Sequence, residues 1–244
     1  MAGRIASFVY GIARYLFFLI TFLYTIGFIG NQFVPKSIDS GGPIAFGPAL
    51  GIDLLLLALF GFQHGIMARG GFKRWVTRFI PAPIERSTFI LFSSFASLLI
   101  FWKWQPLDMT VWNIESRAGH SLLLSLFWSG WAFVVLSSFL LNHFDLFGLR
   151  QVYMYVKGRK YIPIGFKTPT VYKIVRHPIM LAYIIAFWSA PRMTIGHLVF
   201  ALAMTVYIVI GIRLEERDLV NIYGTAYEEY RQRVSMLLPF PGSK

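Results

Sequence analysis

Residues 173–212 read KIVRHPIMLAYIIAFWSAPRMTIGHLVFALAMTVYIVIGI, and this segment carries the strongest indication of the chain's architecture. A helix crosses a bilayer core with about 20 residues, so the apolar part, residues 179–212, is too long for one upright helix. Its middle contains Pro191, which breaks a helical hydrogen-bond ladder, and Arg192, which is costly at mid-bilayer depth. The segment therefore predicts a helical hairpin with a short first arm that turns at the far membrane face.

The rest of the chain has the same apolar character. Of 244 residues, 56% are hydrophobic and only 14% are charged, whereas soluble domains carry about 25% charged residues. Further apolar runs of bilayer length lie at 10–31, 48–67, 84–104 and 121–141. We therefore expect an all-α integral membrane protein, a bundle of five to six transmembrane helices whose last two form the hairpin.

The basic residues indicate how this bundle is oriented. They gather in two loops, between the second and third spans and after the fourth: Arg69, Lys73, Arg74, Arg78 and Arg86, then Arg150, Lys157, Arg159, Lys160, Lys167, Lys173 and Arg176. Cytoplasmic loops are enriched in Lys and Arg, so we expect both termini on the cytoplasmic side. The net charge of +12 fits this interpretation better than nucleic-acid binding, which we do not expect.

Cysteine is absent, so no disulfide, thiolate metal site or cysteine nucleophile is available. By the expected topology His64, His143 and His177 lie at cytoplasmic helix ends, whereas His197 lies toward the outer face. A haem clamped between spans needs two histidines at matching depth, and His64 with His197 is a poor pair. We expect no metal.

Two stretches place histidines among other polar residues. His143 and Asp145 follow the fourth span, where they either complete a helix end or face a pocket in which the carboxylate orients the imidazole. Gln63 and His64 stand near the end of the second span, and polar groups at such positions face the protein interior. Either histidine could therefore line a cavity.

A further polar pair flanks the hairpin. Arg176, His177 and Pro178 begin its first arm, while Glu215 and Glu216 follow its second. Both motifs should emerge on the same side as neighbours. Free N–H groups in the first turn after proline, beside an arginine, suit a carboxylate, and two glutamates suit hydroxyls, an amino group or a sulfonium. S-adenosylmethionine has this combination of groups.

The order of these motifs resembles the isoprenylcysteine carboxyl methyltransferase superfamily. Its pattern is R-H-P-x-Y-x-G, a helical hairpin, E-E-x-x-L and then F-G-x-x-Y-x-x-Y. The matching residues here are 176–178, 215–219 and 223–230, so the resemblance covers roughly the last third of the chain. The chain departs from the pattern at Met180, for the tyrosine, and at Ala182, for the glycine.

Within that superfamily the chain is similar to bacterial methanethiol S-methyltransferases and, less closely, to NnrU membrane proteins. The similar stretches are 63–69, 142–151 and 187–197. The resemblance implies an enzyme of the bacterial inner membrane, with its active site on the cytoplasmic side, that converts methanethiol and S-adenosylmethionine to dimethyl sulfide and S-adenosylhomocysteine. Hydrogen sulfide is a further expected substrate. The expected partners are a small volatile thiol and the lipid bilayer; the sequence sets no oligomeric state.

The resemblance also assigns residues to the cofactor. We expect it to be lined by Gln151, Tyr172, Val175, Arg176, His177, Pro178, Leu181, Glu215 and Glu216. A polar cytoplasmic helix over residues 213–234 would cover the site. The chain is then one domain, 1–244, with four spans in 1–141 and a cofactor-binding region in 142–244 that contains the hairpin 178–213.

A thiol must lose its proton to become a strong nucleophile. We expect His143, paired with Asp145, to accept it, with His64 as the competing candidate. Tyr10, Tyr15 and Tyr153 are open choices for capping a small apolar pocket. Two other functions stay open at this point: a methyltransferase of the same fold acting on a lipid or prenylcysteine, and a non-enzymatic membrane protein of the NnrU kind.

Overall fold

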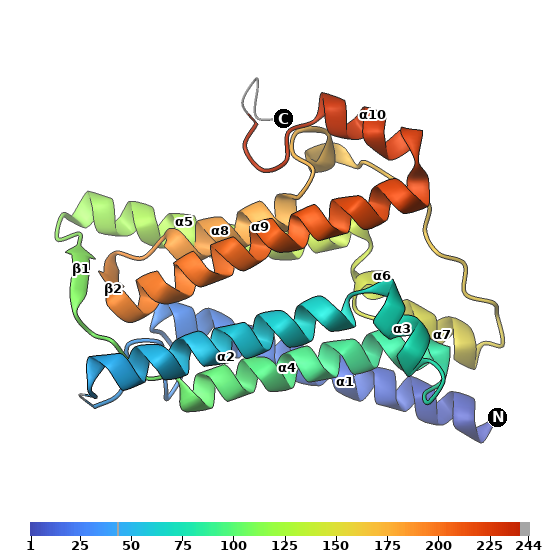
Figure 1. The fold of residues 1–244 in the computed structure, drawn as a ribbon, viewed down its shortest axis with the longest axis horizontal. Helices are drawn as coiled ribbons and strands as arrows, with labels where there is room; N and C mark the ends of the chain where they lie inside the picture. The colour runs from blue at the N-terminus through green and yellow to red at the C-terminus, as the bar shows by residue number, and fades with distance from the viewer. Residues whose placement is uncertain (43, 240–244) are drawn as a thin grey trace. The chain divides into compact units, whose positions relative to one another are not determined.

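The computed structural model describes residues 1–42 and 44–239. Over these residues the chain forms two compact units, each made of two separate stretches. Unit 1 comprises Met1–Met109 and Asn142–Pro163, and unit 2 comprises Thr110–Leu141 and the chain from Ile164 onward. Helices dominate both units, as the sequence predicts (Figure 1). The expectation of a single domain stays a prediction.

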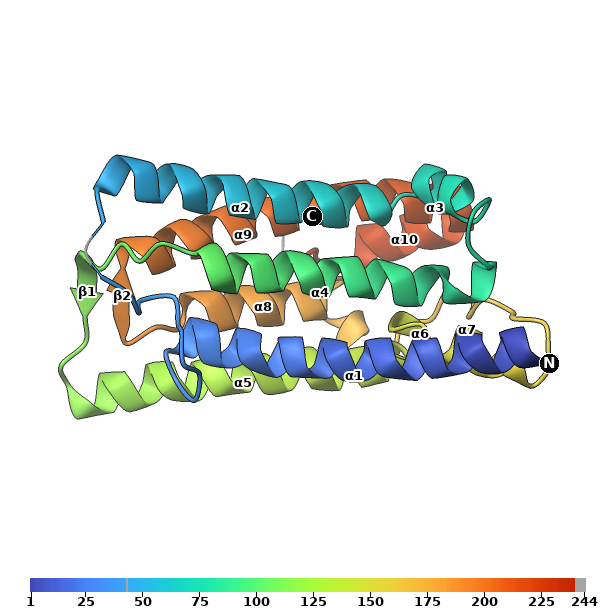
Figure 2. The same cartoon turned by 90° about the horizontal axis from the view of Figure 1, so that it is seen from below.

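Unit 1 is built on three long helices. Its elements are α1 (Ala2–Gly30), α2 (Phe46–Met67), α3 (Gly70–Val76), the 3-10 turn η1 (Ala82–Ile84), α4 (Glu85–Lys103), α6 (His143–Leu146) and α7 (Leu149–Val156). Helix α4 packs against both α1 and α2, and α7 packs along α1 (Figure 2). The short helices α6 and α7 therefore belong with the first three spans, although they follow the fourth in sequence.

Unit 2 contains the hairpin. Its elements are β1 (Thr110–Asn113), α5 (Arg117–Leu141), the 3-10 turn η2 (Thr170–Lys173), α8 (Pro178–Trp188), β2 (Arg192–Thr194), α9 (Ile195–Tyr223) and α10 (Thr225–Arg233). Helices α5 and α8 pack closely because Gly130 has no side chain: a Cβ there would lie 2.9 Å from the backbone nitrogen of Ala186. Ala182, which replaces the superfamily glycine, is fully buried in this unit and so serves helix packing.

The predicted hairpin is confirmed. Its first arm, α8, has 11 residues and its second, α9, has 29. The turn between them is built for helix initiation, since the Thr194 hydroxyl accepts a hydrogen bond from the backbone N–H of His197 at 3.1 Å. The imidazole Nε2 of His197 lies 2.9 Å from the carbonyl oxygen of Phe187, which fastens the two arms together. Arg192 is exposed in the turn.

Two details differ from the sequence expectations. The segment between the third and fourth predicted spans contains β1, which pairs antiparallel with β2, Asn113 opposite Arg192, and the sequence analysis predicts no strand there. The hairpin was expected to end at 213, with a separate helix over 213–234. Instead α9 continues to Tyr223 and stops at Gly224, which has a φ of 56°. The run of charges after 212 contains no helix breaker, so the helix continues until that glycine.

In the described part of the chain five helical segments are long and apolar enough to cross a membrane: Ala2–Gly30, Phe46–Met67, Ala82–Lys103, Arg117–Leu141 and Ile195–Tyr223. The apolar α8 is shorter. These segments overlap the predicted spans, because apolar runs of bilayer length are a strong sequence signal. The chain is therefore an all-α, multi-pass membrane protein.

Candidate active site

The basic and acidic motifs flanking the hairpin meet in unit 2, as the hairpin predicts. Arg176 Nε donates to Glu216 Oε1 at 2.7 Å, and His177 Nε2 lies 3.0 Å from the same oxygen. All three residues are buried, with exposed fractions of 6 to 8%. A buried carboxylate is stable only when it is paired and hydrogen-bonded, so these residues satisfy one another.

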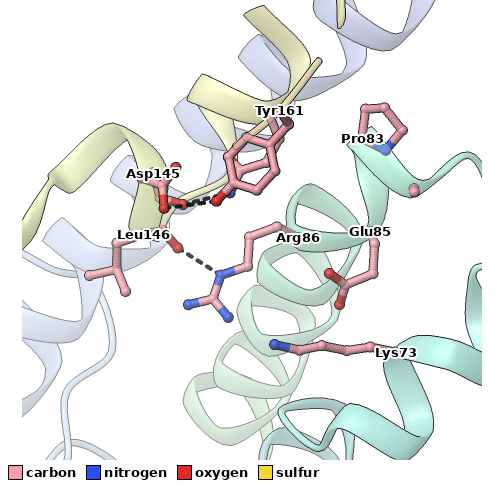
Figure 3. A pocket seen from close by; sticks show the side chains of 9 residues that line it. Lys73, Pro83, Glu85, Arg86, Asp145, Leu146 and Tyr161 are labelled. Atoms are coloured by element: carbon pink, nitrogen blue, oxygen red, sulfur yellow. Dashed lines mark hydrogen bonds between the residues drawn. The ribbon is translucent and has the colours of Figure 1, made fainter. Parts of the chain in front are cut away.

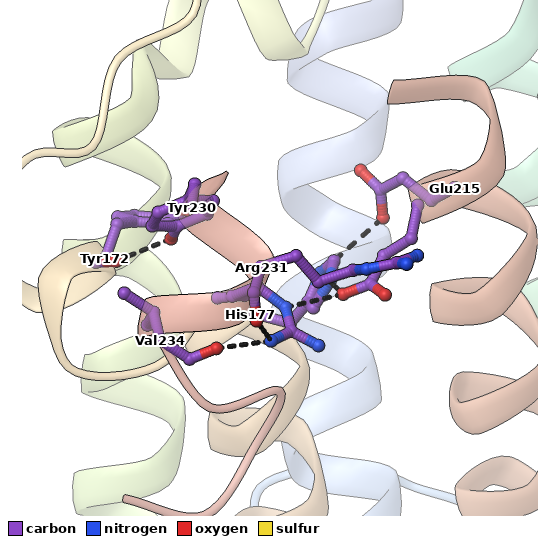
Figure 4. Close-up of polar contacts among 8 residues, drawn as sticks. Tyr172, His177, Glu215, Tyr230, Arg231 and Val234 are labelled. Carbon is purple, nitrogen blue, oxygen red and sulfur yellow. Dashed lines mark hydrogen bonds and ion pairs between the residues drawn. The ribbon is translucent and has the colours of Figure 1, made fainter. Parts of the chain in front are cut away.

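Arg176 also binds backbone carbonyls near the end of α10. Its Nη1 donates to the carbonyl of Arg231 at 2.9 Å and to that of Val234 (Figure 4). Its backbone N–H donates to the carbonyl of Ser235 at 2.8 Å. These carbonyls lie at and just beyond the end of α10. Arg176 therefore joins the end of α10 to the start of α8. Arg176 and Glu216 are each bound by protein groups here, and their expected role at a cofactor stays a prediction.

Aromatic residues surround this ion cluster within unit 2. Tyr172, Tyr227 and Tyr230 are buried, and the ring of Phe166 lies 5.6 Å from that of Tyr227 and 5.3 Å from that of Tyr230. The Tyr230 hydroxyl donates to the Tyr172 carbonyl (Figure 4). Burial raises the pKa of Tyr230 to about 12 and raises the pKa values of Tyr172 and Tyr227. The phenols therefore stay protonated and provide flat, neutral surfaces.

Glu215 is the acidic residue of the pair that a ligand can reach. Its side chain is 50% exposed, and its Oε2 lies 3.8 Å from His177 Nδ1. Pro178 begins α8 at the position where its missing N–H costs little. The first turn of a helix presents backbone N–H groups that suit an anion. Val175 is buried and Leu181 partly buried on either side of that turn.

His143 lies in unit 1 and is buried, with an exposed fraction of 7%. Its Nε2 is 2.7 Å from the hydroxyl oxygen of Tyr15 on α1. The ring of Phe147 lies 4.6 Å from the imidazole, and that of Phe144 lies 5.5 Å away. Burial lowers the pKa of His143 from its ordinary 6.5. The imidazole is therefore neutral near neutral pH and able to accept a proton.

The short helix α6 that carries His143 is held firmly. Gly148 follows it with a φ of 85°, and a Cβ there would lie 3.0 Å from the backbone nitrogen of Ser87, so a side chain is excluded on two grounds. Arg86 Nε donates to the carbonyl of Leu146 at 2.8 Å. These contacts join α6 to the start of α4 and fix the position of the imidazole.

Asp145 has different partners from the one expected. Its Oδ1 accepts from Arg150 Nη1 at 2.9 Å, and its Oδ2 accepts from the Tyr161 hydroxyl at 3.1 Å. The Gln151 amide donates to the Asp145 carbonyl at 3.1 Å. A guanidinium binds a carboxylate more strongly than a neutral imidazole does, so Asp145 pairs with Arg150. The His143 ring forms its hydrogen bond with the Tyr15 hydroxyl instead.

A cavity of about 430 Å³ opens beside Asp145 in unit 1 (Figure 3). It is lined by Lys73, Ala82, Pro83, Glu85, Arg86, Asp145, Leu146, Gln151 and Tyr161. Burial and the neighbouring Asp145 charge raise the pKa of Tyr161, so its hydroxyl stays a donor. Gln151, expected at the cofactor, belongs to this unit, while the other residues expected there belong to unit 2.

His64, the competing candidate for the base, lies between α2 and α4. Its Nδ1 is 3.1 Å from the Ser93 hydroxyl, and its ring meets that of Phe89 edge-on at 4.7 Å. The same hydroxyl donates to the Phe89 carbonyl at 3.0 Å. Since a serine has one proton, the imidazole Nδ1 donates to Ser93. His64 therefore joins α2 to α4.

Sequence reasoning did not assign Tyr15, Tyr161 or Phe166 to their places in these clusters. Each reaches its partner across more than ten positions of the chain: Tyr15 is 128 residues from His143, and Tyr161 is 16 from Asp145. No local motif records such pairs, and aromatic residues are 18% of the chain. Among the described residues, no three His, Cys, Asp or Glu side chains gather as metal ligands.

The chain is similar to several proteins of known name over nearly its full length. It is 52% identical to the methanethiol S-methyltransferase of Crocosphaera subtropica, over 96% of this chain and 92% of that protein. It is 49% identical to that of Mycobacterium tuberculosis, over 98% of both chains. Methanethiol S-methyltransferase 1 of Bradyrhizobium diazoefficiens is 50% identical, over 97% of this chain and 83% of that one.

No protein-family model matches the chain, and no solved structure matches it. The family therefore rests on the curated relatives, whose identity of about 50% extends through both units. This confirms the resemblance drawn from residues 63–69, 142–151 and 187–197. The chain belongs to the methanethiol S-methyltransferase family.

Proposed function

We propose that this chain transfers the methyl group of S-adenosylmethionine to methanethiol, forming dimethyl sulfide and S-adenosylhomocysteine. The observation that carries the proposal is the near-full-length similarity to proteins named for this reaction. Their name gives the thiol. The methyl donor is inferred from the acidic, basic and aromatic groups that surround the start of α8.

The residues of unit 2 fit this donor. Glu215 is half exposed and suits the ribose hydroxyls or the ammonium group, while the first-turn N–H groups of α8 suit the carboxylate. The buried rings of Tyr172 and Tyr227 make the surroundings of this site aromatic and uncharged. Arg176, His177 and Glu216 support the donor site indirectly. Their ion cluster fixes the start of α8 and the end of α10. When bound, the donor supplies an electrophilic methyl group on a sulfonium.

Unit 1 provides the proton acceptor in this proposal. An alkanethiol is mostly protonated at neutral pH, so a base is needed near the sulfur. His143 is buried, neutral and fixed in position by the contacts of α6. His64 remains the competing candidate, although its bond to Ser93 gives it a role in joining α2 to α4.

We also propose that both termini and this site face the cytoplasm, on the basis of the two basic loops. The test uses the absence of native cysteine, because single cysteines can be introduced without removing others. Cysteine at exposed Arg159 should react with an impermeant maleimide only in inverted vesicles, and cysteine at exposed Glu115 only in right-side-out cells. The opposite pattern would reverse the topology.

The function is tested by headspace chromatography of membranes that contain the protein and S-adenosylmethionine. Methanethiol, hydrogen sulfide and a prenylated cysteine are supplied separately. The proposal predicts dimethyl sulfide from methanethiol and no methyl ester from the prenylated cysteine. Methylation of the prenylated substrate alone would favour the lipid-substrate alternative, and a haem Soret band without donor binding would favour the non-enzymatic one.

A further inference from the structure

The contact between Tyr15 and His143 determines which imidazole nitrogen carries a proton. The Tyr15 hydroxyl oxygen lies 2.7 Å from Nε2, and the two rings meet edge to face with centroids 5.7 Å apart. Both residues belong to unit 1. The distance is that of a well-formed hydrogen bond, in which either group could donate.

The surroundings of Tyr15 favour one direction. Its ring is flanked by Phe18 and Phe147, each with its centroid 6.3 Å away. Among the described residues, the hydrogen bond found for its hydroxyl is the one to His143. A hydroxyl proton left without an acceptor in apolar surroundings is costly. Tyr15 therefore donates, Nε2 accepts, and the neutral imidazole carries its own proton on Nδ1.

This tautomer restricts how His143 can act as a base. Nδ1 already holds a proton, and the lone pair of Nε2 is engaged by the Tyr15 hydroxyl. A proton can still reach Nε2 if it arrives through Tyr15, whose oxygen keeps lone pairs for a further donor. The phenyl rings of Phe18 and Phe147, which flank the ring of Tyr15, suit a methyl group and a polarizable sulfur.

We propose that the Tyr15 hydroxyl meets the thiol and passes its proton to His143, an inference that rests on the proposed function. The S–H bond of methanethiol breaks and an O–H bond forms on Tyr15, while the original Tyr15 proton moves to Nε2. The sulfur lone pair forms the new bond to the methyl carbon, and the pair of the broken sulfonium bond stays on the donor sulfur. The products are dimethyl sulfide, S-adenosylhomocysteine and a protonated His143.

The first test is Tyr15→Phe, which keeps the ring and removes the relay. We expect turnover with methanethiol to fall about 10²-fold, the usual scale of acid–base assistance, with unchanged affinity for S-adenosylmethionine in calorimetry. A thiol that is already ionised at neutral pH, such as thiophenol, needs no relay, so its methylation should be nearly normal. Tyr24→Phe is the matched control: it is on the same helix, and its hydroxyl donates to the Lys36 carbonyl instead.

The second test reads the tautomer without any reaction. Nitrogen-15 spectra of histidine-labelled protein, assigned with a His143→Gln variant, should show an unprotonated, hydrogen-bonded Nε2 at His143. In Tyr15→Phe that signal should shift toward the value of a non-bonded nitrogen. A protonated Nε2 in the wild-type protein would overturn the inference.

The outcomes separate this inference from the proposed function. Normal methanethiol turnover in Tyr15→Phe, or an equal loss with methanethiol and thiophenol, would overturn the relay while leaving the methyltransferase assignment intact. If the wild-type protein methylates neither thiol, the assignment fails and the relay fails with it, whereas the nitrogen-15 result would still report the tautomer.

Discussion

Two buried polar clusters in the described part of the chain, one in each unit, are built in opposite ways. In unit 2, Arg176 and Glu216 form an ion pair that also engages His177 and the end of α10. In unit 1, His143 is surrounded by aromatic rings and bonded to a neutral phenol. A charged cluster whose members satisfy one another is suited to holding structure. A neutral imidazole in apolar surroundings keeps its capacity to take a proton. We therefore propose an architectural role for the first cluster and a role in proton transfer for the second.

The largest effect is expected from Glu216→Ala. It leaves the buried Arg176 guanidinium without its carboxylate, and breaking such a pair costs about 3 to 5 kcal/mol. Thermal unfolding in detergent should therefore shift strongly downward, and binding of S-adenosylmethionine should be lost. Glu229→Ala is the control, since its pair with Arg233 is exposed and should not matter. A Glu216→Ala protein as stable as the wild type would refute the architectural role.

The second effect is expected at the base. His143→Gln should lower turnover with methanethiol about 10²-fold, because the glutamine amide cannot accept the proton. Affinity for S-adenosylmethionine should be nearly unchanged, since His143 and the donor residues belong to different units. His64→Gln should cost less turnover and more stability. The assignment is wrong if His143→Gln loses affinity and keeps its turnover.

The third effect is expected at Glu215, the exposed member of the acidic pair. Glu215→Gln should weaken donor binding about tenfold, equivalent to about 1.4 kcal/mol, with an unchanged unfolding temperature. Calorimetry and thermal unfolding on one preparation measure both quantities. A lower unfolding temperature with normal affinity would place Glu215 with the structural cluster instead.

The smallest effect concerns pH. Burial lowers the pKa of His143 in the folded protein from its ordinary 6.5, so the imidazole stays neutral until the pH falls below that value. The acid limb of the kcat/KM profile should therefore lie below pH 6.5. By the same shift, the unfolded chain takes up this proton first, so the contribution of His143 to stability falls as the pH drops below 6.5. An acid limb above 6.5 would contradict a buried neutral base.

The fold could be predicted from sequence to a large extent, because apolar runs and Pro191 are local signals. The proximity of Arg176 to Glu216 could also be predicted from the sequence, because a helical hairpin returns the chain to the side from which it started. The pairing of β1 with β2 did not follow, because strands of four and three residues carry no distinct periodicity. The continuation of α9 to Tyr223 did not follow either, because a charged run is compatible both with a helix end and with the solvated face of a longer helix.

The site was harder to predict for a physical reason. His143 and Asp145 are two residues apart, and proximity in sequence suggested a dyad. In the fold, the carboxylate binds Arg150 and Tyr161, and the imidazole binds Tyr15 on α1. Which neighbour a side chain selects depends on distant elements that pack beside it, and one sequence does not contain that information.

The central claim is that this membrane protein moves a methyl group from a sulfonium donor to methanethiol. It is tested most directly with purified protein in lipid nanodiscs, given methanethiol and S-adenosylmethionine carrying a deuterated methyl group. Headspace mass spectrometry should detect dimethyl sulfide with one labelled methyl, formed in step with S-adenosylhomocysteine. Unlabelled product alone, or none while the donor remains intact, would contradict the account.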